Sequence, residues 1–295
     1  MPSSAINAAC VAACLFLAAC STERREPAVS AAESIVVDDF GDTVALGPAL
    51  RIVSLNPVST ELLFVSGGAN RLVGRTHWDL YPEGAAAIPD LGNGIGPNVE
   101  AVIGARPDLV ILYASTSNRR AATALQSAGV RTLSIRTDHL SDLFRLADVY
   151  ARVTGDTMPR AVADSARRTV DSVRALPRVA NPPSIVWRQG EPPIYVAGRG
   201  SFQGELIEVA GGVNAFSDVE APSPQVSIEE IVRREPSAIL TGPDGAAKVR
   251  ASPTWRAVAA VRDGRVLVVD TALVGRPGVR MGEAARHLRL LISSP

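Results

Sequence analysis

The sequence predicts an α/β protein built from two similar lobes. Its 295 residues are about twice the length of a typical domain. Short apolar segments of the kind that form strands alternate with short helical segments, which is typical of parallel sheets with crossover helices. One passage also occurs twice: residues 61–70 read ELLFVSGGAN and residues 205–214 read ELIEVAGGVN. We therefore expect two related lobes.

The first 20 residues predict an export signal. An apolar run too short to span a membrane ends in Leu17-Ala18-Ala19-Cys20, which matches the lipobox of bacterial lipoproteins. No Lys or Arg precedes this run, and the alternative is a plain secretory signal with an incidental cysteine. We expect residues 1–20 to be a lipoprotein signal peptide, with Cys20 lipidated. The protein is then periplasmic or extracytoplasmic and anchored to the membrane.

Composition excludes several classes of function. Residues 21–33 are polar and predict a flexible tether, and all three cysteines precede it, so the folded part has no disulfide or cysteine nucleophile. The 30 Lys and Arg residues balance the 30 Asp and Glu residues. This balance argues against nucleic acid as a partner, because phosphate binding needs a basic surface.

Residues 34–139 predict the first lobe. Two apolar runs around Asp-Phe-Gly-Asp predict a β-hairpin at its start. Pro57 can begin the first helix, because proline lacks only an N–H that the first turn leaves unbonded. Gly67-Gly68 is a good helix end. The other expected elements are strands at 51–55, 71–76, 109–113 and 131–135 and helices at 98–106 and 118–128.

Residues 140–177 predict a helical connection. Pro159 can begin a helix that runs to residue 175 and would span roughly 25 Å, enough to join two lobes. Its apolar residues recur at spacings of three and four, as in a helix with one buried face. These residues are Val162, Ala166, Thr169, Val170 and Val173.

Residues 178–295 predict the second lobe. The alternation resumes with a strand at 184–187 and the apolar segment PPIYVAG, and a helix at about 281–293 ends the pattern. The remaining expected elements are helices at 202–211 and 227–235 and strands at 238–242 and 265–269.

A second pair of passages extends the repeat. VEAVIGARPDLVIL, residues 99–112, matches IEEIVRREPSAILT, residues 228–241, and the match aligns Glu100 with Glu229. Both pairs keep the same order along the chain. Convergence of helix, stop and strand signals is the alternative. The interpretation we favour is two lobes that are joined by a long helix and face each other across a cleft.

Five passages together resemble one family. RIVSLNPVSTELLFVSGG, VGRTHWDLYPEGA, PNVEAVIGARPDLVIL, GGVNAF and PQVSIEEIVRREPSAIL are similar to the vitamin B12-binding branch of the helical-backbone (class III) periplasmic binding proteins. The resemblance covers about residues 50–293. It implies two Rossmann-like α/β lobes, a single long backbone helix between them and a ligand cleft between the lobes.

Members of this family serve ABC importers for vitamin B12, ferric siderophores and haem. The resemblance implies a solute-binding protein, not an enzyme, that captures a corrinoid and delivers it to an ABC permease dimer with its ATPase subunits. Haem or a ferric siderophore is the alternative cargo. No cofactor is expected, and we expect a monomer.

Ligands of open α/β lobes lie beyond the carboxyl ends of the strands, so the loops there carry the candidate binding residues. Aromatic faces suit a large flat ligand, and the resemblance makes Trp78 and Tyr113 such contacts. Arginine can bind the amide, phosphate or carboxylate groups of a ligand. For these aromatic and arginine side chains, packing within a lobe or a solvated surface role is the alternative. The expected ligand-binding residues are Trp78, Tyr81, Asn93, Tyr113, Trp187, Arg188, Ser223 and Arg276.

Two loops depart from the family pattern. Asn93 belongs to the segment GNGIGPN, which predicts a flexible loop whose backbone can approach the ligand closely. The vitamin B12-binding branch has a tryptophan near this loop and another at the position of Ser223, and this chain has neither. At the end of the strand at 184–187, we expect Trp187 in the core and Arg188 exposed to the cleft.

Glu100 and Glu229 are expected to dock with the permease. In the family, one acidic residue on each lobe meets arginines of the permease dimer, and two equivalent carboxylates suit a two-fold partner. Both residues also lie near helix N-termini, where the helix dipole favours carboxylates, and this is the alternative. Glu230 is the neighbouring candidate.

Metal binding and hydrolysis have little support. His77, His139 and His287 are widely separated in the sequence, so no metal site is expected, although His77 alone could bind a haem iron. The chain has no G-x-S-x-G motif, and GRGSFQG does not supply one. An exported hydrolase is a remote alternative.

Overall fold

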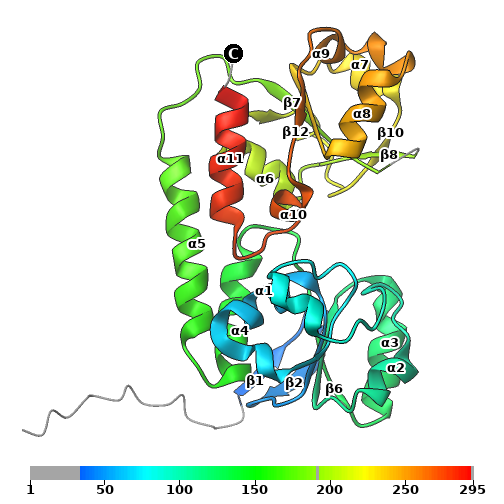
Figure 1. Ribbon diagram of the computed structural model, residues 1–295, viewed down its shortest axis with the longest axis vertical. Helices are drawn as coiled ribbons and strands as arrows, with labels where there is room; N and C mark the ends of the chain where they lie inside the picture. Colours follow the sequence, from blue (N-terminus) through cyan, green and yellow to red (C-terminus); the bar gives the residue numbers. More distant parts are fainter. Residues whose placement is uncertain (1–33, 191–192, 294–295) are drawn as a thin grey trace, which may run out of the picture.

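The computed structural model describes residues 34–190 and 193–293. Two lobes lie one above the other beside a long helix, α5 (Figure 1). The predicted signal peptide, Cys20 and the tether fall outside the described residues. Within the described ranges, no helix has the length and apolar character needed to cross a membrane.

The first lobe begins with the predicted hairpin. Strands β1 (Ser34–Val37) and β2 (Thr43–Leu46) pair antiparallel. The chain then forms a sheet of four parallel strands in the order β4-β3-β5-β6. These strands are β3 (Ile52–Leu55), β4 (Leu72–Gly74), β5 (Leu109–Tyr113) and β6 (Arg131–Ile135), and the helices are α1 (Pro57–Leu63), α2 (Val99–Gly104) and α3 (Thr116–Ser127). A π-turn over Phe64–Gly68 continues α1, and Gly67 in it has a positive φ of 81°, a conformation that favours glycine.

The second lobe repeats this topology. Four of its strands are parallel in the order β9-β7-β11-β12, which matches β4-β3-β5-β6 strand for strand. These strands are β7 (Ser184–Gln189), β9 (Val213–Asn214), β11 (Ala238–Thr241) and β12 (Val266–Val268). The repeated passages therefore mark equivalent helices, α1 with α6 (Phe202–Val209) and α2 with α7 (Ile228–Arg233). The prediction of two related lobes is confirmed.

The second lobe also has elements that the pattern did not predict. Strands β8 (Ile194–Val196) and β10 (Gln225–Val226) extend its sheet antiparallel. Three helices follow β11, namely α8 (Pro243–Ala251), α9 (Ala259–Arg262) and α10 (Thr271–Val274), and a 3-10 turn lies at Thr254–Ala257.

The connection between the lobes is helical. Helix α4 (Asp142–Thr154) lies in the first lobe, and α5 (Met158–Arg174) runs along both lobes (Figure 1). The 17 residues of α5 span about 25 Å, as expected. The last helix, α11 (Met281–Ser293), lies beside α5 and also packs on α6 and α10 of the second lobe. Gly282 allows this approach, because a Cβ at this position would overlap the side chain of Thr169.

One hydrophobic core reaches through both lobes. It includes Leu62 of α1, Tyr150 of α4, Ala166 of α5, Leu206 of α6 and Leu288 of α11, all buried. Each lobe has a further core on the outer face of its sheet. Because the shared core packs both lobes on α5 and α11, we expect little hinge motion between them.

Candidate ligand cleft

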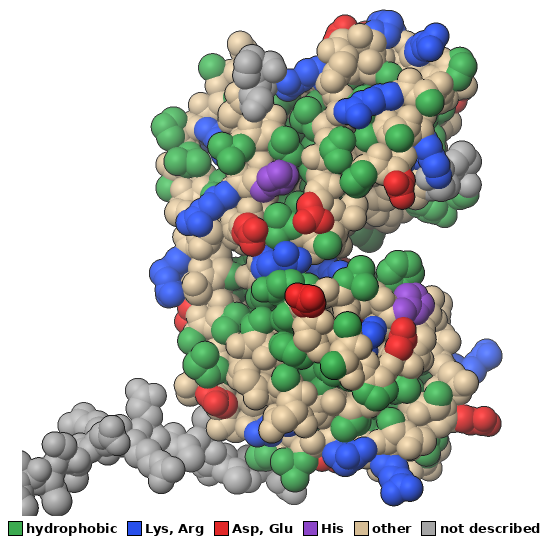
Figure 2. Space-filling view, in the orientation of Figure 1, with side chains coloured by type: hydrophobic (Ala, Val, Ile, Leu, Met, Phe, Trp, Pro, Cys, Tyr) green, Lys and Arg blue, Asp and Glu red, His purple; other side chains and the backbone are tan. Residues whose placement is uncertain are grey.

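The two lobes share a cavity of about 350 Å³. It lies where the strands of the first lobe end and where α1 and α6 begin, and Figure 2 shows the notch between the lobes. Its lining comes from both lobes and consists of Pro57, Val58, Trp78, Tyr113, Thr137, Asp138, Phe202, Gly275, Arg276 and Pro277. Trp78, Tyr113 and Arg276 were expected as ligand contacts; Asp138 and Phe202 were not.

A buried carboxylate presents Trp78 to this cavity. Asp79 is fully buried and accepts hydrogen bonds from the backbone amide of Thr76 (2.9 Å) and the hydroxyl of Thr60 (3.0 Å). Burial raises the pKa of Asp79, and these hydrogen bonds oppose the increase. They fix the turn over residues 76–79, which leaves the Trp78 side chain 57% exposed beside the cavity. An exposed indole held on a rigid turn is suited to stacking on a ligand.

Tyr113 lies at the carboxyl end of β5 and is tied to Asp138. Its hydroxyl donates a hydrogen bond to Asp138 Oδ1 at 2.6 Å. Burial raises the pKa of Tyr113, and the hydrogen bond and negative charge of Asp138 raise it further. The phenol is therefore held in its protonated form, and Tyr113 lines the cavity.

Two arginines of the second lobe reach the first lobe. The guanidinium of Arg276 donates to the backbone carbonyl of Trp78 at 3.2 Å. Arg280 lies over the ring of Tyr81, 3.8 Å from its centroid, in a cation–π contact. Tyr81 does not line the shared cavity; it borders a separate depression beside α5 and α11.

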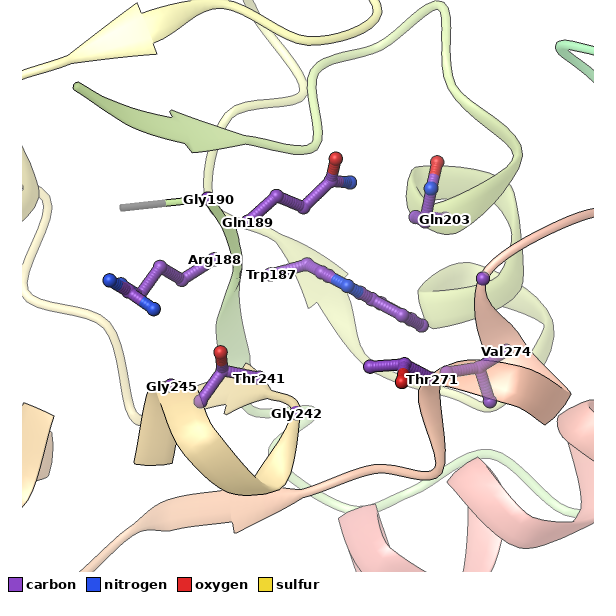
Figure 3. A pocket seen from close by; sticks show the side chains of 11 residues that line it. Trp187, Arg188, Gln189, Gly190, Gln203, Thr241, Gly242, Gly245, Thr271 and Val274 are labelled. Atoms are coloured by element: carbon purple, nitrogen blue, oxygen red, sulfur yellow. The ribbon is translucent and has the colours of Figure 1, made fainter. Parts of the chain in front are cut away.

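A second cavity of about 350 Å³ lies in the second lobe and shares Gly275 with the first. Trp187 and Arg188 both line it but point in opposite directions, because successive side chains of a strand alternate between the faces of the sheet (Figure 3). Trp187 is 5% exposed and belongs to the core, as predicted.

Arg188 differs from its expectation. It is also only 5% exposed, and its guanidinium lies 5.7 Å from the ring centroid of Trp255. The prediction that Arg188 is exposed to the cleft is wrong. Strand alternation turns this side chain toward the outer core of the lobe, where Trp255 on the Thr254–Ala257 turn covers it.

Asn93 and Ser223 are exposed and line neither cavity. The segment 92–98, predicted to be a flexible loop, makes two hydrogen bonds to α3. Buried Asn118 accepts a hydrogen bond from the Gly96 amide and donates to the Gly94 carbonyl, both at 2.8 Å. A Cβ on Gly94 would lie 2.6 Å from the Leu55 carbonyl oxygen, so this glycine serves close packing on β3.

The aligned acidic residues occupy equivalent positions. Glu100 and Glu229 are each the second residue of their helix, α2 or α7, and both are exposed. Hydrogen bonds from its own backbone amide and from Ser227 lower the pKa of Glu229. The neighbouring Glu230 is engaged by Arg233 and Arg234 within the lobe. Both α2 and α7 lie on the side of the molecule away from α5 (Figure 1).

The three histidines do not form a metal site. Among residues 34–190 and 193–293, no three His, Cys, Asp or Glu side chains gather as metal ligands. His77 is exposed, and its ring centroid lies 4.5 Å from that of Trp78. His139 lies beside Glu205, with Nδ1 2.6 Å from Oε1.

Comparison with known proteins assigns the family. The periplasmic binding protein family model matches residues 52–273. A vitamin B12-binding protein of Vibrio cholerae serotype O1 is 26% identical over 243 residues, 82% of this chain and 88% of that protein.

Two solved structures agree with this match. The periplasmic vitamin B12 binding protein BtuF of Vibrio cholerae has a TM-score of 0.73 and 25% identity, and the alignment covers 83% of this chain and 97% of that one. The apo form of the periplasmic haem-binding protein RhuT of Roseiflexus sp. RS-1 has a TM-score of 0.75 and 25% identity, and the alignment covers 82% of this chain and 97% of that one. Such proteins bind solutes and are not enzymes. With its two α/β lobes on a helical backbone, the chain belongs to the periplasmic binding protein family, class III.

Proposed function

We propose that this protein captures a corrinoid between its lobes and delivers it to an ABC permease dimer with its ATPase subunits. The observation that carries this proposal is the shared cavity, to which one lobe supplies Trp78 and Tyr113 and the other supplies Phe202 and Arg276. Aromatic rings can cover the face and edge of a flat macrocycle, and the guanidinium can donate to its amides or phosphate. The similarity to vitamin B12-binding proteins supports the same cargo.

Tyr113 favours a corrinoid over haem. A protein that holds haem iron supplies an axial ligand such as His, Cys, Met or Tyr. Asp138 keeps the Tyr113 phenol protonated, which disfavours an iron-bound tyrosinate, and residues 21–295 contain no cysteine. Cobalamin carries its own axial ligands and needs none from the protein.

Haem or a ferric siderophore is the alternative cargo, and one local feature favours it. His77 contacts Trp78, which lines the cavity, and the Arg276 guanidinium can pair with carboxylates of such ligands. The similarity to a haem-binding protein is in keeping with this alternative.

A binding panel tests the cargo. Residues 21–295 are titrated with cyanocobalamin, haemin and a ferric hydroxamate siderophore, and tryptophan quenching is followed. We expect saturable one-to-one binding of cyanocobalamin that weakens about tenfold in Trp78→Ala, because a contacting aromatic ring is lost. Haemin binding that disappears in His77→Ala, without cyanocobalamin binding, would contradict the corrinoid proposal.

The membrane and permease contacts are part of the same proposal. The signal peptide would be cleaved just before Cys20, Cys20 would become the new N-terminus and carry the lipid, and residues 21–33 would tether the lobes to the membrane. Glu100 and Glu229 would dock on the permease, since both are exposed at equivalent positions of the two lobes.

Docking is tested with the permease and its ATPase in lipid vesicles. Glu100→Ala with Glu229→Ala should lower cargo delivery at unchanged cargo affinity, because both residues lie outside the cavity. Glu230→Ala is the matched control, since this carboxylate is already engaged by Arg233 and Arg234. Equal delivery by the double variant and the parent protein would refute this role.

A further inference from the structure

The two glutamates that begin the repeated passages make reciprocal contacts across the lobes. Glu61, on α1 of the first lobe, accepts a hydrogen bond at Oε2 from the backbone amide of Val279, 3.0 Å away, just before α11. Glu205, on α6 of the second lobe, accepts one at Oε2 from the backbone amide of Leu140, 2.8 Å away, between β6 and α4. Each lobe therefore holds the backbone of a segment that belongs to the other side.

Both held segments also line the ligand cavity. Arg276 and Pro277 lie just before Val279, and Thr137 and Asp138 lie just before Leu140. The helices that carry the two glutamates contribute to the same lining through their first residues. The cavity is thus built from two helix starts and two crossing segments, and one glutamate connects each helix to its crossing segment.

The Glu61 contact is closely fitted. Glu61 is buried, with only 1% of its surface exposed, and Arg276 and Arg280 supply positive charge nearby. Gly278 makes room for the carboxylate, because a Cβ at that position would overlap Glu61 Oε2. The Glu205 contact is more open, with the side chain 34% exposed, and it includes His139 Nδ1 at 2.6 Å from Oε1.

The helix dipole does not explain this pair. Glu205 lies in the first turn of its helix, where the dipole favours a carboxylate, but no acidic residue occupies the first turn of α1. The property common to Glu61 and Glu205 is a carboxylate that accepts a backbone N–H from the other side of the cleft.

We propose that Glu61 and Glu205 are a reciprocal pair of positioning residues. They fix the crossing segments 276–279 and 137–140 and so set the shape of the cavity that receives the ligand. This inference rests on the proposed function for its consequence in ligand binding, but its geometric part can be measured without any ligand.

A spin-label experiment measures the geometry. Residues 21–295 contain no cysteine, so Arg120→Cys on α3 and Ala247→Cys on α8 place one exposed label on each lobe. Pulsed electron paramagnetic resonance gives the distance distribution between the labels. We expect Glu61→Ala and Glu205→Ala to broaden or shift it, and Glu205→Gln to restore it, because the glutamine carbonyl can still accept from Leu140.

Exposed glutamates on the same lobes provide matched controls. Glu208→Ala on α6 and Glu83→Ala in the first lobe should leave the distribution unchanged. If Glu61→Ala fails to fold, Glu205→Ala and its glutamine counterpart still decide the question. A distribution in Glu205→Ala that superimposes on that of the labelled parent would overturn the proposal.

Cyanocobalamin affinity is the second measurement. We expect Glu205→Ala to weaken binding about tenfold, in proportion to the loss of one charge-assisted hydrogen bond, and Glu205→Gln to stay near the parent affinity. Equal losses in both variants would overturn a role through the backbone contact. If the parent protein binds no cyanocobalamin, the corrinoid proposal fails, whereas the distance measurement still tests the pair.

Discussion

Glu61 should make the stability of this protein fall as the pH rises from about 4 to 7. Burial raises the pKa of Glu61 from 4.5 to about 6, and the opposing attraction of Arg276 and the Val279 hydrogen bond does not cancel this effect. The folded state therefore binds the proton more tightly than the unfolded state does. A pKa shift of this size corresponds to about 2 kcal/mol in the free energy of unfolding, since one pKa unit is worth about 1.4 kcal/mol.

The sign of the effect follows from this difference. The stability contributed by protonated Glu61 is fully present below about pH 4.5 and is lost as the pH rises through about 6. Urea unfolding of the parent protein and of Glu61→Gln between pH 4 and pH 7 isolates the contribution of Glu61, because the other titrating groups cancel in the comparison. We expect the free energy of unfolding of the parent protein to fall by about 2 kcal/mol relative to that of the variant between pH 4 and pH 7. A constant difference, or one that rises with pH, would refute the reasoning.

Four further predictions follow from the site and the connection. Trp78→Ala should weaken cargo binding by about 1.4 kcal/mol, measured by fluorescence titration, with an unchanged melting temperature because the side chain is 57% exposed; a large drop in melting temperature would indicate a packing role instead. Asp138→Asn should lower the pKa of Tyr113 in an ultraviolet titration, since a negative charge is removed; no change would show that burial alone sets it. Gly282→Ala should cost roughly 1–3 kcal/mol in urea unfolding, because its Cβ meets α5, whereas Gly104→Ala, with nothing within 4 Å, should cost nothing; equal effects would contradict the packing argument. Small-angle scattering profiles of the free and cargo-bound protein should superimpose, and marked compaction would contradict the rigid connection.

Local patterns predicted the elements that have strong periodicity or clear ends. The strands of the first sheet are apolar runs bounded by turn residues, and α5 carries its buried residues at helical spacing. The repeat predicted two similar lobes because it preserves a helix, its glycine end and the following strand. Strands β9 and β10 have two residues each, which is too short for any pattern. The packing of α11 on α5 depends on distant residues and has no local signal.

The site was predicted only where a single side chain carries the signal. The family resemblance pointed to Trp78 and Tyr113, and the binding chemistry of arginine pointed to Arg276; the structure brings these three to one cavity. Asp138 and Phe202 look like ordinary turn and helix residues, so nothing local marks them. The contact of Glu61 with Val279 joins residues 218 positions apart and uses a backbone amide, which any sequence provides. The repeat itself was the available signal, because both passages keep a glutamate at the equivalent position of an apolar helix.

Calorimetric titration of cyanocobalamin into residues 21–295 tests the central claim most directly. The account predicts saturable, one-to-one binding in the submicromolar range, with a negative heat-capacity change as the aromatic cavity loses its water. No heat at high protein concentration, checked at two temperatures, together with saturable binding of haemin or a ferric siderophore, would contradict a corrinoid cargo. That result would assign the cavity to an iron complex.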